Sequence, residues 1–287
     1  MRLSALFLAA AAALSATACV GPFAAGAAAP PFAGNYVALG ASFAAGPGLG
    51  ELKPGSPARC AQTMQGYPTL IAEQLRMALV DASCSGATTM HVLHGWKELP
   101  PQIDALTADT ALVTVTVGGN DLNYVGNLFA ASCAPDGTSQ VAGRKFVCPE
   151  PRRPTEEQYA AVEANLREIA SQVRTRAPNA RLAFVTYLSL VPQTPCAAAP
   201  LSAQAVAIST EIADRLSAMT RRVAEEAGAL LVPIDDESRL HTACDAEPWT
   251  WGARATVPGD GIAWHPNAAG MRATASAVIA ALASRTR

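Results

Sequence analysis

Four short segments of this 287-residue sequence carry the groups that acyl transfer requires. Ser42 in "YVALGAS" supplies a hydroxyl, and His265 in "WHPNAAG" supplies an imidazole. Gly86 in "CSGATT" and Asn120 in "VGGND" supply a backbone N–H and a side-chain amide. A hydroxyl activated by an imidazole can attack a carbonyl carbon, and the two N–H donors can hold the oxygen that becomes negative. The sequence therefore predicts a nucleophile, a base and an oxyanion hole.

The segment around Ser42 also has a simpler interpretation. Taken alone, "GAS" is typical of a strand-to-helix turn with a capping serine. The glycines of residues 46–50 let the chain turn, but "GPGLG" lacks the Lys and Ser/Thr of a phosphate-binding loop. Only the combination with the other three segments favours catalysis.

The elements expected around these segments alternate between strand and helix. Nearly continuous apolar runs predict parallel strands that are covered on both faces, at residues 36–39, 80–83, 111–117, 181–188 and 230–235. Amphipathic patterns predict helices at residues 67–78, 155–176, 202–227 and 268–284. Residues 122–154 fit neither pattern and are expected to form a long surface insertion. The alternation predicts a three-layer α/β domain, in which ligands bind at the carboxyl ends of the strands.

The four segments resemble the Ser, Gly, Asn and His blocks of the SGNH (GDSL-type) hydrolases. The resemblance covers nearly all of residues 35–285 and is strongest to secreted actinobacterial-type esterases and lipases. It implies a flavodoxin-like sandwich with a five-stranded parallel sheet, a single domain over residues 33–287, and ester hydrolysis without a metal or cofactor. It also implies that Ser42 is the nucleophile and His265 the base, with an oxyanion hole formed by Ser42, Gly86 and Asn120.

Two positions depart from the family pattern. Ala41 stands where the family usually has Asp before the serine, and Ile262 stands where it usually has Asp three residues before the histidine. Asp260 lies five residues before His265 instead. A backbone carbonyl, most simply that of Ile262, could accept the Nδ1 proton and fix the tautomer. A Ser–His dyad and an unusually spaced triad with Asp260 both stay open.

Residues 1–30 resemble a secretory signal peptide followed by a linker. Arg2 precedes an apolar stretch of roughly 15 residues, which is shorter than the ~20 that a membrane span needs. Cys19 ends this stretch in "SATAC", which resembles a bacterial lipoprotein signal, although Ala16 stands where a larger aliphatic residue is usual. We expect a secreted protein, or a periplasmic or cell-envelope lipoprotein anchored to the membrane through Cys19.

The remaining six cysteines suit an oxidising compartment. Many pairings are open to six cysteines. We expect the sequential one, because each bond then closes a separate loop: Cys60–Cys84, Cys133–Cys148 and Cys196–Cys244. The sequence has no C-x-x-C pair and no H-E-x-x-H motif, so a metal site is not expected.

Composition limits the partners. Charged residues make up 15% of the chain, the formal net charge is −2 and no basic run is present, so nucleic acid is not expected to bind. We expect a monomer that acts on a small-molecule or lipid ester. The missing Asp residues motivate an alternative of another class, a catalytically silent lipid- or glycan-binding protein on the same fold.

Two further groups of residues have open interpretations. His91 and His94 lie three apart and could bind a metal or catalyse, but a structural pair at the surface or in the core is favoured. Three tryptophans, Trp249, Trp251 and Trp264, precede His265 in the sequence. They could form the wall of an acyl pocket or pack against the loop between Cys196 and Cys244.

Overall fold

The computed structural model describes residues 32–133, 138–141, 144–147 and 150–284. The predicted signal peptide and linker, including Cys19, lie outside these residues, as does Cys148. None of the helices in the described part of the chain is both long and apolar enough to span a membrane.

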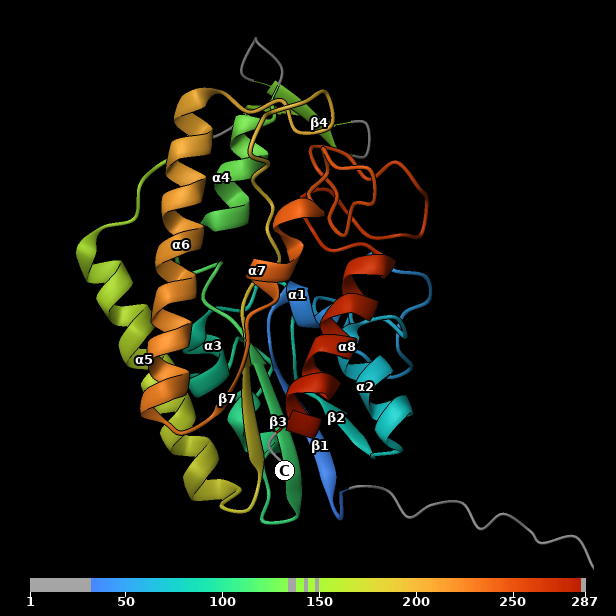
Figure 1. Ribbon diagram of the computed structural model, residues 1–287, viewed down its shortest axis with the longest axis vertical. Coiled ribbons are helices and arrows are strands. Elements are labelled where there is room, and N and C mark those ends of the chain that lie inside the picture. Colours follow the sequence, from blue (N-terminus) through green and yellow to red (C-terminus); the bar gives the residue numbers. More distant parts are fainter. Residues whose placement is uncertain (1–31, 134–137, 142–143, 148–149, 285–287) are drawn as a thin grey trace, which may run out of the picture.

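A five-stranded parallel sheet forms the centre of the fold, with the strand order β2-β1-β3-β6-β7 (Figure 1). Its strands are β1 (Asn35–Gly40), β2 (Leu79–Asp81), β3 (Thr110–Thr116), β6 (Arg181–Val185) and β7 (Leu230–Val232). Val37 of β1 pairs with Val80 on one side and Val113 on the other. The predicted sheet is therefore confirmed, and β1, which leads to Ser42, lies near its middle.

Three strands end earlier than the apolar runs suggested. The predicted strands 181–188 and 230–235 stop at Val185 and Val232, and β2 stops at Asp81 rather than at residue 83. Pro233 has no N–H to continue the ladder, and the chain turns into the short helix α7 (Ile234–Glu237). The apolar run continues past the strand because these following residues are also buried.

Helices cover both faces of the sheet, as Figure 1 shows. One face carries α2 (Tyr67–Leu75) and α8 (Ala268–Ser284), and the other carries α3 (Thr89–His94), α5 (Glu156–Arg176) and α6 (Ala203–Glu226). The capping box predicted for α5 is present, with Thr155 and Gln158 bonded to each other's backbone N–H. The predicted helix 67–78 ends early because Arg76 adopts a left-handed conformation.

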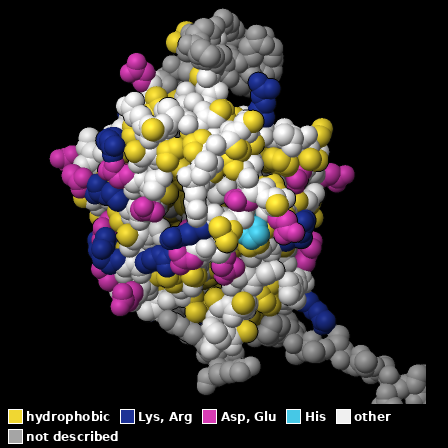
Figure 2. All heavy atoms as spheres, turned by 45° about the horizontal axis from the view of Figure 1, so that its top comes forward, with side chains coloured by type: hydrophobic (Ala, Val, Ile, Leu, Met, Phe, Trp, Pro, Cys, Tyr) yellow, Lys and Arg dark blue, Asp and Glu magenta, His cyan; other side chains and the backbone are white. Residues whose placement is uncertain are grey.

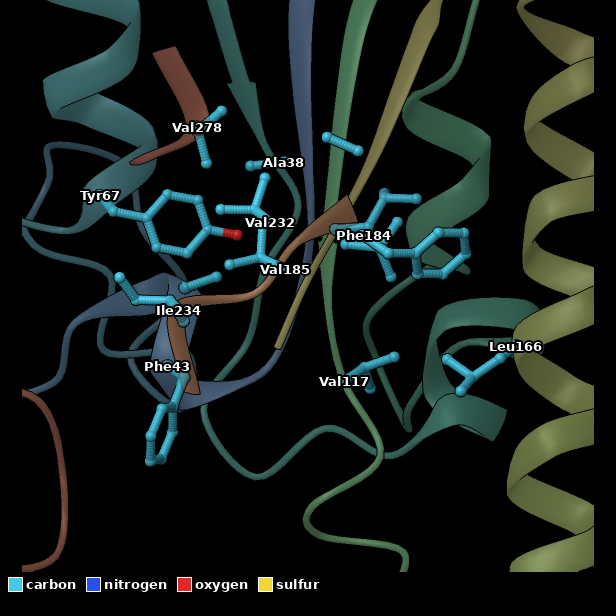
Figure 3. Packing of buried hydrophobic residues seen from close by; sticks show 14 of the residues in the cluster. Ala38, Phe43, Tyr67, Val117, Leu166, Phe184, Val185, Val232, Ile234 and Val278 are labelled. Atoms are coloured by element: carbon cyan, nitrogen blue, oxygen red, sulfur yellow. The ribbon is translucent and has the colours of Figure 1, made fainter. Parts of the chain in front are cut away.

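Apolar side chains fill the space between the sheet and each helical layer. Figure 3 shows Tyr67 of α2 and Val278 of α8 on one side of the strands, and Leu166 of α5 on the other. All three are at most 1% exposed. Two-sided burial is what makes the strands read as continuous apolar runs.

The segment 122–154 is more ordered than expected. It contains α4 (Tyr124–Ala131), whose Tyr124, Val125 and Leu128 are buried, and α4 packs against α6. A hairpin of β4 (Thr138–Val141) and β5 (Arg144–Val147) follows. The sequence did not predict α4, because this helix is too short to give a clear periodic signal. The remaining short elements are α1 (Ser42–Ala45), η1 (Gln102–Ala105) and η2 (Ser238–Leu240).

Candidate active site

Ser42 and His265 lie together at the carboxyl edge of the sheet. Ser42 is the first residue of α1, two residues beyond the end of β1, and His265 lies three residues before α8 begins. The Ser42 Oγ and the His265 Nε2 are 2.9 Å apart, although 223 positions separate them in the sequence. Both are largely buried, with 7% and 6% exposure. The distance suits proton transfer from the hydroxyl to the imidazole.

A main-chain carbonyl contacts the other nitrogen of the imidazole. The His265 Nδ1 is 2.8 Å from the carbonyl oxygen of Ala263, so the oxygen accepts a bond from the Nδ1–H tautomer. The expectation that this carbonyl belongs to Ile262 was wrong by one residue. The reason is the backbone of Trp264, whose φ of 55° turns the chain sharply between Ala263 and His265.

Trp264 is held in this conformation by the surrounding structure. A left-handed backbone is unusual for a bulky residue and costs on the order of 1–3 kcal/mol. Trp264 is fully buried, its N–H donates to the carbonyl of Gly252, and its indole N–H donates to Ser132 Oγ over 2.8 Å. These contacts offset the strain, and they fix the turn that aims the Ala263 carbonyl at His265.

Asp260 has a different set of partners. Its Oδ1 accepts the N–H of Ala268, the first residue of α8, over 2.7 Å, and its main-chain carbonyl accepts the indole N–H of Trp251. A carboxylate at the first N–H of a helix satisfies a free donor and interacts favourably with the helix dipole. The geometry therefore gives Asp260 a capping role at α8.

Burial sets the protonation state of His265. Removal from water lowers its pKa to about 4, against the opposing effect of the bond to the Ala263 carbonyl. The ring is consequently neutral at pH 7, and its Nε2 can accept a proton. Within the described part of the chain, no carboxylate is among the hydrogen-bond partners of this ring.

The three expected oxyanion donors come from three loops at the same edge of the sheet. The N–H groups of Ser42 and Gly86 have no acceptor within the described ranges. Gly86 has a φ of 85°, and a Cβ added there would be 3.1 Å from the Trp96 ring, so a side chain would be both strained and crowded. Asn120 Nδ2 donates to the carbonyl of Ala87 over 2.8 Å, which uses one of its two hydrogens and orients the amide.

Asp121, the residue after Asn120, is a positioning residue that the sequence did not single out. Its carboxylate accepts the N–H of Thr89 at 3.0 and 3.1 Å and the Thr89 hydroxyl at 2.5 Å. Burial raises the pKa of Asp121, while the bonds from Thr89 oppose that shift. The contact ties the Asn120 loop to the helix that follows the Gly86 loop.

Gln102 holds the end of β1 in a similar way. Its Oε1 accepts the N–H of Gly40 at 2.7 Å, and its Nε2 donates to the carbonyl of Gly40 at 3.0 Å. The buried amide thus bonds the last residue of β1 as the backbone of a neighbouring strand would, two residues before Ser42. Nothing in the sequence around Gln102 indicated this role, since the two positions are 62 residues apart.

Two of the expected disulfides, Cys60–Cys84 and Cys196–Cys244, are present. Cys133 is also disulfide-bonded, and its expected partner, Cys148, lies outside the described residues. The Cys60–Cys84 bond lines a cavity of about 320 Å³ together with Ala87 and Trp96. Neither Ser42 nor His265 lines this cavity, so it is separate from the catalytic pair.

Two of the remaining candidate residues, His91 and Trp249, have structural partners. His91 accepts the N–H of Thr88 through Nδ1 as part of a cap on α3 and stacks on Trp96 at 4.5 Å. Trp249 stacks on His241 at 3.9 Å, close to Cys244 in the sequence. These contacts favour the packing interpretation for both His91 and Trp249.

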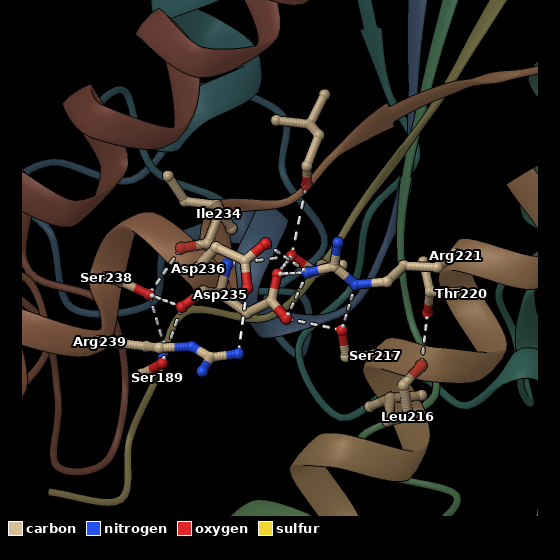
Figure 4. A network of polar contacts seen from close by, with 12 residues as sticks. Ser189, Leu216, Ser217, Thr220, Arg221, Ile234, Asp235, Asp236, Ser238 and Arg239 are labelled. Carbon is tan, nitrogen blue, oxygen red and sulfur yellow. Dashed lines mark hydrogen bonds and ion pairs between the residues drawn. The ribbon is translucent and has the colours of Figure 1, made fainter. Parts of the chain in front are cut away.

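A second polar centre lies beyond β6 and β7 (Figure 4). Asp235 accepts hydrogen bonds from Thr186 and Ser217, both over 2.6 Å, and from Arg221 at 2.8 and 2.9 Å. Burial alone would raise the pKa of Asp235, but these donors outweigh it and hold the pKa below its usual value. The carboxylate stays ionised and joins α6 and α7 to the sheet.

Comparison with known proteins identifies the family. A model of the GDSL-like lipase/acylhydrolase family matches residues 38–273. Lipase 2 of Streptomyces coelicolor is 33% identical over 247 residues, which cover 83% of this chain and 82% of that protein. The crystal structure of phospholipase A1 from Streptomyces albidoflavus NA297 superposes with a TM-score of 0.67 at 25% identity, covering 88% of this chain and 99% of the other.

An extracellular lipase from Streptomyces rimosus has the same fold, with a TM-score of 0.67 at 24% identity over 87% of this chain and 100% of the other. The chain therefore belongs to the GDSL-like lipase/acylhydrolase family, and its class is carboxylic ester hydrolase. The resemblance to the actinobacterial lipase branch is confirmed.

Proposed function

We propose that this protein is an exported serine esterase or lipase that works through an acyl-enzyme and a Ser–His dyad. One observation carries the proposal: His265 bonds Ser42 Oγ at 2.9 Å through Nε2 and the Ala263 carbonyl at 2.8 Å through Nδ1. The two contacts give the ring a nucleophile to deprotonate and an acceptor that fixes its tautomer. They also argue against a catalytically silent binding protein, which has no need of this alignment.

In the first half-reaction, Ser42 Oγ attacks the carbonyl carbon of the ester while its proton moves to His265 Nε2. The carbonyl oxygen becomes negative and takes bonds from the N–H groups of Ser42 and Gly86 and from Asn120 Nδ2. The Ala263 carbonyl stabilises the imidazolium through its Nδ1–H. The C–O bond to the alcohol then breaks, and the alcohol leaves with the proton from Nε2.

In the second half-reaction, His265 Nε2 removes a proton from water, and the water oxygen attacks the acyl carbon on Ser42. The same three donors hold the second tetrahedral intermediate. Its collapse releases the carboxylic acid and returns the proton to Ser42 Oγ. An alcohol in place of water would give acyl transfer by the same steps.

The relatives suggest the class of substrate. A lipase and a phospholipase A1 are among them, so we propose carboxylic esters of lipids as substrates. The chemistry itself needs only an ester carbonyl that reaches Ser42. Short soluble esters are therefore suitable test substrates.

Export is part of the proposal. The Arg2-led apolar stretch predicts removal of the N-terminus, so protein collected from the medium or the membrane fraction should lack Met1 in mass spectrometry. A lipid-modified Cys19 would select the lipoprotein version, whereas cleavage at a later alanine would exclude it.

Labelling with a fluorophosphonate tests the mechanism. This reagent should modify the folded protein at one serine, and peptide mapping should place the adduct on Ser42. Ser42→Ala should abolish the label, and His265→Ala should slow it severely. An adduct on another serine, or folded wild-type protein that takes up no label, would refute the proposed mechanism.

A further inference from the structure

Exposed apolar side chains lie on the two loops that adjoin Ser42 and His265 in the chain. We define the apolar rim as four residues, Leu52, Met64, Val257 and Ile262, which are 60%, 40%, 50% and 37% exposed. They come from two loops, residues 46–64 and 252–263, that are distant in the sequence. Clustered exposed apolar side chains are uncommon on soluble proteins and mark interaction surfaces.

The two loops that carry the apolar rim are bonded to each other. Gly50 N–H donates to the carbonyl of Gly259 at 2.7 Å, and Gly261 N–H donates to the carbonyl of Gly48 at 2.9 Å. A Cβ added at Gly48 would be only 2.7 Å from the Ile262 side chain, so the backbone of one loop approaches the rim residue of the other. Within the first loop, Leu52 pairs with Thr63, the neighbour of Met64.

The apolar rim lies at the catalytic edge of the molecule. Loop 46–64 directly follows α1, which begins at Ser42, and loop 252–263 ends two residues before His265. Figure 2, in which the top of Figure 1 is turned forward, shows hydrophobic side chains gathered over this end. On the opposite edge, the described connections 76–78, 106–109, 177–180 and 227–229 contain no exposed large hydrophobic residue.

The charged side chains of the two rim loops form no cationic cluster: Lys53 and Arg59 are in ion pairs, and the exposed Arg254 shares these loops with the acidic Glu51 and Asp260. Lys53 contacts Asp81 at 2.6 Å, and Arg59 contacts Glu98 at 2.8 Å. A surface that binds anionic lipid headgroups would instead offer a cluster of unpaired cations. The rim thus suits a partner that is apolar and carries no net charge.

We propose that the apolar rim docks on a zwitterionic lipid surface, from which an ester enters the site at Ser42 and His265. The inference rests on the proposed ester hydrolysis and adds where the enzyme meets its substrate. A protein partner or a second copy seated on these loops would cover the approach to the catalytic pair, whereas a lipid surface would supply it. Side chains of this kind enter the boundary between headgroups and acyl chains.

Binding to vesicles of ether-linked phosphatidylcholine tests the proposal, because these lipids have no ester to hydrolyse. The full-length mature enzyme should co-sediment with them, and Leu52→Ser combined with Val257→Ser should weaken binding at least tenfold. Val80→Ser is the matched control: it makes the same exchange at a residue that is 39% exposed on the edge strand β2 and should leave binding unchanged. Both variants should hydrolyse a soluble p-nitrophenyl ester within about twofold of wild type.

Several results would overturn the proposal. The wild-type enzyme could fail to bind these vesicles, or bind only vesicles that contain anionic lipid. The double variant could bind as well as wild type, or it could convert a wild-type dimer into a monomer, which would make the rim an interface between copies. If the wild-type enzyme does not hydrolyse the soluble ester, the proposed function is refuted instead. The two tests are independent, because vesicle binding is measured without turnover.

Discussion

Two polar centres at the same edge of the sheet, one half-buried and one buried, differ in how fully their hydrogen bonds are satisfied. Asp235 receives bonds from Thr186, Ser217 and Arg221, and these donors lower its pKa in spite of burial (Figure 4). His265 has two neutral partners, and burial lowers its pKa to about 4. Asp235 therefore keeps a negative charge that its hydrogen-bond donors compensate, whereas His265 stays a neutral base.

This difference gives the Asp235 centre a structural role and the His265 centre a catalytic one. A compensated carboxylate joins elements together, but its lone pairs are occupied. At the other centre, the N–H groups of Ser42 and Gly86 have no acceptor among the described residues, so they remain available for an oxyanion. Substitutions at the two centres should therefore affect different measurements.

The largest expected effect is on activity at the His265 centre. Ser42→Ala and His265→Ala should each reduce turnover of a soluble ester by roughly 10⁴ to 10⁶, as loss of either residue does in other serine hydrolases. Because Ser42→Ala removes only a hydroxyl, its midpoint of urea unfolding should stay near that of wild type. If folded Ser42→Ala kept more than a tenth of wild-type turnover, the His265 centre would not be the catalytic one of the two.

Removing one oxyanion donor should cost less. Asn120→Ala should lower kcat by about 10² to 10³, with a small change in KM, because the amide acts mainly on the transition state. Asn127→Ala is the control, since it removes a buried amide of α4 that bonds Arg152 and Asn123 but is not one of the expected oxyanion donors. It should leave kcat within about threefold, and a kcat for Asn120→Ala as high as that of the control would remove Asn120 from the oxyanion hole.

The low pKa of His265 predicts activity in mild acid. The neutral ring is the active form, so kcat/KM should hold as pH falls from 7 and should drop only as pH approaches about 4. Stability should change over a wider window: the unfolded chain takes up a proton on His265 near pH 6.5, so folding weakens from there down to about pH 4. A pH–rate profile with its acid limb near 6.5 would contradict the buried, neutral base.

The Asp235 centre should respond in stability alone. Asp235→Asn should lower the free energy of unfolding by about 2 kcal/mol, because the charge-assisted bonds from Arg221 are lost while Arg221 keeps its charge. Urea denaturation would measure this loss. Turnover of a soluble ester should stay within about twofold, and a larger fall in the folded variant would mean that the two centres are coupled.

Much of the fold followed from local patterns. The five strands and four long helices were predictable because two-sided burial and amphipathic periodicity are properties of single elements. The ends of β6 and β7 and the existence of α4 were not, since apolar runs continue through Pro233 and α4 contributes only two turns. Burial by distant elements decides such boundaries, and a local pattern does not record it.

The site was predictable in its residue types and less so in its geometry. Ser42, Gly86, Asn120 and His265 lie in recognisable blocks, each at the carboxyl edge of the sheet. The acceptor for His265 depends instead on the backbone of Trp264, which only the contacts to Gly252 and Ser132 explain. Gln102 was missed for the same reason, because its partner is distant in the sequence.

The central claim is that a carbonyl, rather than a carboxylate, orients His265, and Asp260 offers the most direct test. In Asp260→Ala, turnover of a soluble ester should fall tenfold or less, which corresponds to about 1.4 kcal/mol. The free energy of unfolding should fall by about 1 kcal/mol, because the cap on α8 is lost. Asp260→Asn keeps an oxygen for the Ala268 N–H and should be close to wild type in both. A fall of about 10⁴ in turnover for either folded variant, as in a true triad, would contradict the claim.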